Sequence, residues 1–115
     1  MNGGRKNPGT DLVTQDATLK RIIDAIVEAV DPTRIYLFGS RARGDHRPDS
    51  DYDLAIVYDG EMSPKDVKVA TRGRLRGEYL DMDLLVLSSS ELERFKRVVN
   101  SLSWLVSERG AVIYG

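Results

Sequence analysis

The chain has 115 residues, 17 Lys and Arg against 18 Asp and Glu, no cysteine and a single histidine. This length suits one compact domain, and the near balance of charge argues against a protein that coats nucleic acid through bulk charge. Disulfides, thiolate metal sites and multi-histidine zinc sites are excluded because the ligands they need are missing.

The N-terminal stretch and the hydropathy of the chain point away from a membrane. No apolar run approaches the roughly 20 residues that cross a bilayer, and the first eleven residues, MNGGRKNPGTD, lack the apolar core of a signal peptide. We therefore expect a cytoplasmic location. Residues 1–14 are polar and rich in glycine, which predicts a flexible arm, and we expect one domain over residues 15–115.

The first expected elements are a helix and a buried strand. From residue 16 the apolar residues recur on one helical face, namely Leu19, Ile22, Ile23, Ile26, Val27 and Val30. Asp31-Pro32 ends this helix. The aromatic and β-branched residues 35–38 that follow predict a strand.

The remaining elements complete an α/β pattern. After a loop over residues 39–50 we expect a strand over 52–58, a weakly amphipathic helix from 64 to about 79, and a strand over 80–87. The capping sequence SSSELE then introduces one long helix over 91–109, followed by a short strand over 111–114. This order predicts a small mixed β-sheet flanked by helices.

Two aspartates stand at the start of the second expected strand, in the sequence Asp51-Tyr52-Asp53. Residues two apart in a strand point to the same face, roughly 7 Å apart at their Cα atoms. The two carboxylates would repel each other, and a divalent cation removes that conflict. Carboxylates without His or Cys favour Mg²⁺ or Mn²⁺. The alternative is that one aspartate caps a turn and the other is solvated.

The third expected strand, LDMDLLVL, carries Asp81 and Asp83 on one face. Neighbouring strands lie about 4.8 Å apart, so a carboxylate from this strand would complete a cluster of three. Such a cluster can hold two metal ions roughly 3.5–4 Å apart, the spacing of in-line nucleotidyl transfer. The alternative is an edge strand with one wet face.

The end of the first strand leads into Gly39-Ser40 and an arginine-rich loop. Glycine lets a backbone approach a ligand closely, and a short helix that starts at Ser40 would offer its free N–H groups to phosphate. Arg41, Arg43 and Arg47 add positive charge nearby. The alternatives are a plain turn and solvated arginines. Together with the aspartates, these residues are what a nucleoside triphosphate and its metal ions need.

The segment GSRARGDHRPDSDYDLAIV resembles the signature of the DNA polymerase β-like nucleotidyltransferase superfamily. In particular it is similar to the minimal nucleotidyltransferase branch, small proteins paired with HEPN-domain toxins. The ending RGAVIYG also resembles the close of these domains. The likeness covers roughly residues 16–115. It implies a minimal nucleotidyltransferase fold in which the third carboxylate stands in a strand before aliphatic residues, so Asp83 matches best and Asp81 is the fallback.

The resemblance implies transfer of AMP from ATP to a hydroxyl, with release of pyrophosphate. Asp51, Asp53 and Asp83 would hold two Mg²⁺ ions, or Mn²⁺ in their place, and Gly39 and Ser40 would hold the triphosphate, with Arg41 and Arg43 as further phosphate contacts. It further implies an antitoxin that adenylylates a tyrosine of a HEPN-type partner. The chain is too short to enclose the acceptor as well, so we expect a partner or a second copy to complete the site.

Two other hypotheses remain open. The protein could neutralise a partner by direct binding alone, although binding does not need a carboxylate cluster. It could also be a glycosyltransferase that uses Asp-x-Asp to hold a nucleotide-sugar metal, but such domains are usually larger and the Gly-Ser turn would then lack a role. The acceptor, the base and the oligomeric state stay undetermined by the sequence.

Overall fold

The computed structural model describes residues 13–115 and contains one four-stranded sheet. Its strands are β1 (Arg34–Phe38), β2 (Tyr52–Val57), β3 (Met82–Leu87) and β4 (Ala111–Tyr114), in the order β3-β2-β1-β4. Strand β1 runs antiparallel to β2 and β4, whereas β2 and β3 are parallel. The predicted small mixed sheet is therefore confirmed.

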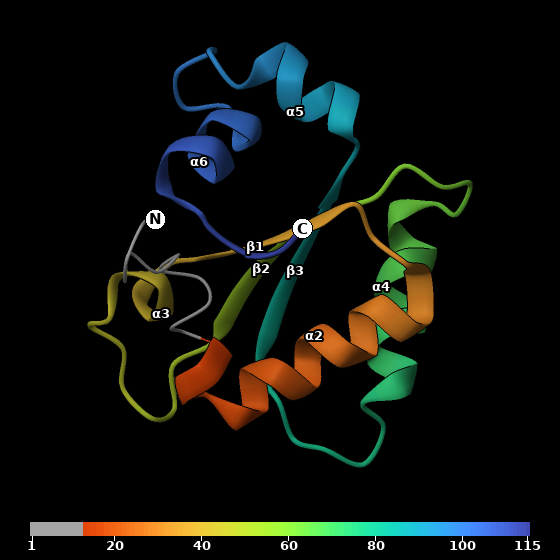
Figure 1. Cartoon of the computed structure of the whole chain (residues 1–115), viewed down its shortest axis with the longest axis vertical. Coiled ribbons are helices and arrows are strands. Elements are labelled where there is room, and N and C mark those ends of the chain that lie inside the picture. The colour runs from red at the N-terminus through yellow and green to blue at the C-terminus, as the bar shows by residue number, and fades with distance from the viewer. Residues whose placement is uncertain (1–12) are drawn as a thin grey trace, which may run out of the picture.

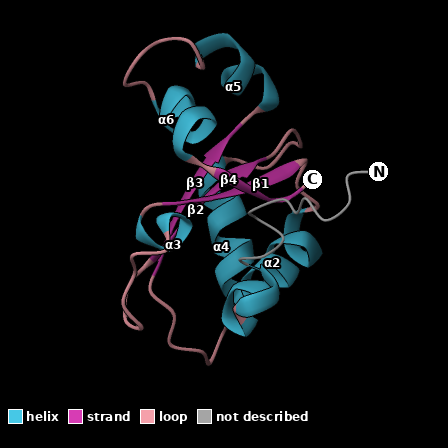
Figure 2. Ribbon diagram, turned by 60° about the vertical axis from the view of Figure 1, so that its left-hand side comes forward, coloured by secondary structure: helices cyan, strands magenta, loops and turns pink. Residues whose placement is uncertain are grey.

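Helices lie on both faces of this sheet. Helices α2 (Ala17–Val30) and α4 (Pro64–Arg74) cover one face, and α5 (Ser89–Phe95) and α6 (Leu102–Arg109) stand over the other (Figures 1 and 2). The short helix α3 (Ser40–Arg43) follows β1 directly at one end of the sheet. None of the helices within residues 13–115 has the length and apolar character needed to span a membrane.

Strand alternation divides the core into two clusters. On the α2–α4 side, β1 and β2 contribute the fully buried Ile35, Leu37, Leu54 and Ile56. Tyr36, Ala55 and Val57 point the other way and pack beneath α5 and α6 with Val106. Because side chains two apart in a strand share a face, Asp53 belongs to the α5–α6 side of the sheet. The core thus determines which face the predicted site occupies.

The helix predicted from 64 to about 79 ends earlier than expected. Ser63 caps α4 through a bond from the Asp66 backbone N–H (3.1 Å), and α4 begins at Pro64 as predicted, but the helix stops at Arg74. Gly77 has a φ of +91°, which belongs to a turn rather than a helix. Strand β3 correspondingly begins at Met82 instead of residue 80. The predicted flexible arm, apart from residues 13 and 14, lies outside the described part of the chain.

The prediction of one long helix over residues 91–109 was wrong, because α5 and α6 are separate. The break contains Asn100 at a φ of +69°, a left-handed conformation that a helix interior does not adopt. Ser101 then starts α6: its Oγ accepts a bond from the Trp104 N–H (3.1 Å) and donates to the Phe95 carbonyl (2.8 Å). The sequence Asn-Ser carried this signal, but the continuous apolar spacing masked it.

Candidate active site

Two of the predicted carboxylates lie side by side on parallel strands. Asp53 of β2 and Asp83 of β3 are register partners, so they share the α5–α6 face of the sheet. Asp51 directly precedes β2 and is exposed, next to the partly buried Asp53. Asp81 precedes β3, where its carbonyl accepts a bond from the Tyr52 N–H (2.9 Å). The register thus places Asp83, rather than Asp81, opposite Asp53.

The charges of these aspartates act on one another. Burial raises the pKa of Asp53 above its ordinary value, and the charges of Asp83 and Asp51 raise it further. The nearby Arg43 guanidinium works in the opposite direction. Asp53 is therefore a carboxylate whose ionisation the fold disfavours, which is typical of functional sites.

The Gly-Ser turn touches this carboxylate. Gly39 follows β1 with a φ of +78°, and a Cβ placed on it would lie 2.3 Å from Oδ2 of Asp53. Gly39 lies beside Asp53 because the preceding residue, Phe38, pairs with Asp53 across β1 and β2. The expected short helix does begin at Ser40, and the first N–H groups of any helix lack partners within it. Only glycine allows the turn to sit against Asp53.

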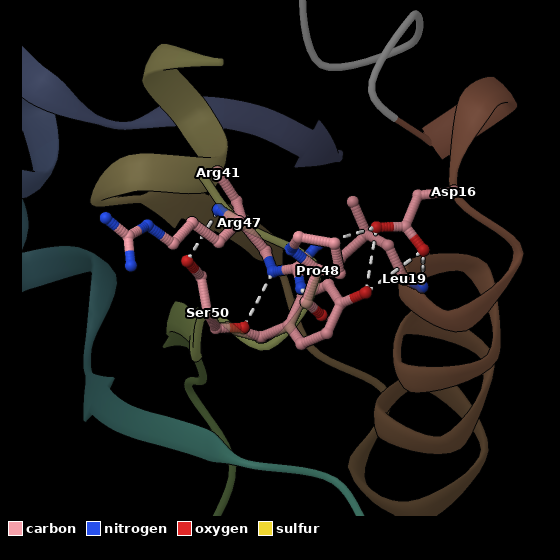
Figure 3. Close-up of polar contacts among 7 residues, drawn as sticks. Asp16, Leu19, Arg41, Arg47, Pro48 and Ser50 are labelled. Carbon is pink, nitrogen blue, oxygen red and sulfur yellow. Dashed lines mark hydrogen bonds and ion pairs between the residues drawn. The ribbon is translucent and has the colours of Figure 1, made fainter. Parts of the chain in front are cut away.

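The two predicted phosphate-binding arginines differ in the structure. Arg43 is exposed, pairs with Asp45 at 3.2 Å and lies close enough to Asp53 to influence its pKa. Arg41 is buried on the other side of the loop. Its guanidinium bonds to the carbonyls of Ser50 and Pro48 and pairs with the Asp16 carboxylate (Figure 3). The structure therefore brings Arg43 to the site and gives Arg41 different partners from the phosphate that we predicted.

The sequence analysis did not identify two residues behind the site. Asp16 was recognised only as the start of a helix, yet its carboxylate also accepts a bond from the Tyr52 hydroxyl (2.8 Å) and pairs with Arg41 (3.4 Å). Tyr52 was noted only as the residue between two aspartates. Its strand position, with the side chain opposite to those of its neighbours, was the available signal.

The chemistry of the donor set fits a hard divalent cation, although the side chains do not converge on one point. Asp51, Asp53 and Asp83 offer oxygen ligands only, as Mg²⁺ prefers. Within residues 13–115, no three potential ligands are grouped closely enough to form a complete metal site. Burial and the charges of Asp83 and Asp51 raise the pKa of Asp53, and a bound cation would offset these effects.

Fold and site together define a class of protein: an α/β transferase domain with carboxylates on adjacent strands beside a glycine-led turn. The polymerase beta nucleotidyltransferase family model matches residues 20–110. The chain therefore belongs to this nucleotidyltransferase family. No curated protein matches the sequence significantly.

A solved structure agrees with this assignment. It is the crystal structure of a protein from Sulfolobus solfataricus that is assigned as a nucleotidyltransferase. The two chains share 28% sequence identity, with a TM-score of 0.51, over 79% of this chain and 83% of the other. The fold and the family thus agree with the interpretation of the sequence.

Proposed function

We propose that this protein transfers AMP from ATP to a hydroxyl group and that it requires Mg²⁺. The observation that carries the proposal is the in-register pair of Asp53 and Asp83, with Asp51 and the Gly39 turn beside it. In the reaction the acceptor oxygen forms a bond to the α-phosphorus, the α–β phosphoanhydride bond breaks, and pyrophosphate leaves.

Each residue of the site has a role in this proposal. Asp51, Asp53 and Asp83 hold two Mg²⁺ ions, with Mn²⁺ as a substitute. When bound, such ions neutralise phosphate charge and align the attacking and leaving oxygens. Asp83 also accepts the proton of the attacking hydroxyl, because its exposed carboxylate is open to an approaching acceptor.

The triphosphate lies against the Gly39-Ser40 turn. The absence of a side chain at Gly39 lets the phosphates approach the backbone, and the Ser40 hydroxyl donates to a phosphate oxygen. Arg43 is exposed beside Asp53 and supplies positive charge to the same group. Arg41 has no phosphate role here, because its guanidinium is already bonded inside the loop.

The acceptor in this proposal is a tyrosine of a HEPN-type partner, as the family resemblance implies. The α5–α6 hairpin offers a contact surface, because five apolar residues on it are 39–66% exposed: Phe95, Val98, Val99, Leu102 and Leu105. Trp104, on the same hairpin, is half-buried, and its ring centre lies 5.8 Å from the Arg109 guanidinium. The proposed contact surface therefore consists of these five exposed residues and does not depend on Trp104.

The test is to incubate the purified protein with the product of its neighbouring gene, Mg²⁺ and each of the four nucleoside triphosphates in turn. Intact-mass spectrometry should show addition of one AMP to the neighbour with ATP, and peptide mapping should place it on tyrosine. A neighbour that stays unmodified but loses its activity on binding would replace the proposal with inhibition by direct contact. Modification of another molecule would retain nucleotidyl transfer and change only the acceptor.

A further inference from the structure

Arg41 is a charged side chain that the fold buries, with only 7% of its surface exposed. It belongs to α3, one residue after Ser40. Its Nε donates to the Ser50 carbonyl at 3.0 Å, and Nη2 donates to the Pro48 carbonyl at 3.1 Å (Figure 3). Nη1 pairs with Oδ2 of Asp16 at 3.4 Å. A guanidinium held by three partners at once has one orientation available.

Tyr52, in β2, contacts both Arg41 and Asp16, so the three side chains form one network. The Arg41 guanidinium lies 3.9 Å from the centre of the Tyr52 ring, within the range of a cation–π contact. The Tyr52 hydroxyl donates to the Asp16 carboxylate at 2.8 Å, and that carboxylate also caps α2 by accepting the Leu19 N–H at 3.0 Å. The network thus connects α2, α3 and β2.

The position of this network relative to the aspartates gives it a consequence for catalysis. Arg41 bonds to the residue before Asp51, which is Ser50, and stacks on the residue after it, which is Tyr52. The side chain of Tyr52 lies on the face of β2 opposite to that of Asp53. Loss of the Arg41 guanidinium would therefore remove a contact from each neighbour of Asp51.

We propose that Arg41, with Tyr52 and Asp16, is a positioning residue that fixes Asp51 and Asp53 relative to the Gly39-Ser40 turn. This inference rests on the proposed function, since it assigns these aspartates to the metal ions. Arg41 touches neither substrate nor ion; it acts through the backbone on either side of Asp51. One side chain thus couples the triphosphate turn to the metal ligands.

The planar fork of arginine is essential for this role. Lysine keeps the charge, but its single ammonium cannot reach two carbonyls and a carboxylate in fixed directions or stack on a ring in the same way. Arg41→Lys therefore removes the positioning and retains the charge. Tyr52→Phe is the second variant: it keeps the ring under Arg41 and removes only the hydroxyl bond to Asp16.

The experiment measures Mn²⁺ binding by calorimetry with a non-hydrolysable ATP analogue present, well below the melting temperature of each variant. We expect Arg41→Lys to weaken Mn²⁺ binding about 10-fold, as loss of supporting contacts typically does, and Tyr52→Phe to weaken it less. In transfer assays the Mg²⁺ concentration for half-maximal rate should rise in the same order, and saturating Mg²⁺ should restore most of the rate to Tyr52→Phe.

Two control variants separate positioning from stability. Val67→Ala truncates a fully buried residue of α4, so it should lower the melting temperature without changing Mn²⁺ affinity. Arg76→Lys repeats the chemical change at an exposed position and should change neither.

The possible outcomes distinguish failure of the positioning role from failure of the proposed function. Wild-type Mn²⁺ affinity in both folded network variants would overturn the positioning role and leave the proposed function intact. The same would follow if Val67→Ala weakened Mn²⁺ binding as much as Arg41→Lys at equal loss of melting temperature. A wild-type protein that binds no Mn²⁺ with the nucleotide analogue would overturn the proposed function, and the positioning role with it.

Discussion

The two ends of β2 hold aspartates in opposite electrostatic situations. At the start, Asp53 faces Asp83 and Asp51, and burial and these charges raise its pKa. Just beyond the other end, Asp59 accepts bonds from the Ser89 N–H (2.8 Å), the Ser89 hydroxyl and the Thr33 hydroxyl (2.9 Å). These bonds lower the pKa of Asp59. Asp53 at the start of β2 thus has a raised pKa, whereas Asp59 just beyond the end of β2 has a lowered one.

The difference separates a charge of the proposed site from a structural one. Asp59 connects the start of α5 to the segment before β1, so its carboxylate has a structural role. Within residues 13–115 no hydrogen bond lowers the pKa of Asp53, and the Arg43 guanidinium only partly counters burial and the charges of Asp83 and Asp51. Carboxylates with such raised pKa values cluster at functional sites, where a bound cation can neutralise them.

The largest effect should come from Asp51→Asn combined with Asp53→Asn. The change removes both shared ligands of the proposed ions while preserving shape. We expect transfer to fall by more than about 100-fold, beyond the 10- to 100-fold typical of outer contacts. A labelled-ATP assay measures the rate, and circular dichroism confirms the fold. Undiminished transfer by the folded double variant would refute the assignment of these aspartates.

The Gly39-Ser40 turn should give the next largest effect. Ser40→Ala removes one hydrogen bond to a charged group, worth roughly 1.5–3 kcal/mol, or about 10- to 150-fold in kcat/KM. Gly39→Val should cost more, because a Cβ would lie 2.3 Å from Asp53 Oδ2 and the φ of +78° disfavours side chains. Steady-state kinetics with ATP measures both. As a control, Gly73→Ala adds a methyl group to α4 where no atom lies within 4 Å and should leave kcat/KM unchanged.

The elements of this fold followed from local patterns in the sequence. The apolar spacing from residue 16 and the break before residue 64 predicted where α2 and α4 begin, and these two starts are confirmed, whereas α5 begins at Ser89 rather than at 91. The split between α5 and α6 was missed because a single left-handed residue, Asn100, interrupts an otherwise continuous apolar pattern. The spacing of apolar residues predicts which face of a helix is buried, but it does not predict the backbone φ of a single polar residue.

The site was only partly predictable, for a related reason. Asp51, Asp53 and Gly39 are close in sequence, so local spacing predicted their association. The resemblance favoured Asp83 over Asp81, but the register that places Asp83 opposite Asp53 is a pairing between distant strands that the sequence alone does not specify. The burial of Arg41 depended on Asp16, 25 residues away, and no local pattern encodes such a contact. Polar contacts between residues far apart in the sequence could therefore not be predicted from local patterns.

Asp59→Ala should reduce stability and leave the site alone. The variant loses three hydrogen bonds, one of them to the first turn of α5, and we expect a cost of about 1 kcal/mol, typical of a helix-capping side chain. This corresponds to a fall of about 4 °C in Tm for a domain of this size. Because the folded pKa of Asp59 is lowered, its stabilisation is present at neutral pH and is lost as pH falls through the folded pKa. Thermal melts at two pH values would measure this, and an equal deficit at both would contradict it.

Asp53→Asn alone should have the smallest effect on folding, with the opposite sign. The folded pKa of Asp53 is raised, so the native state binds its proton more tightly than the unfolded chain does, and stability falls as pH rises through that range. The wild type therefore carries the full cost at pH 7, and the variant should be more stable there by roughly 0.5 kcal/mol, the scale of a partly exposed charge interaction. The gain should shrink as the pH is lowered towards the ordinary value of about 3.9.

Adding Mn²⁺ and an ATP analogue should make the wild type more stable than Asp53→Asn. The ion stabilises the wild type through mass action, because it binds the folded state, whereas the variant lacks the carboxylate that the ion requires. Thermal melts of both proteins with and without Mn²⁺ and the analogue would reveal the crossing. A variant that is less stable than the wild type without the ion would show that the protein itself satisfies Asp53, and the two ends of β2 would then be alike.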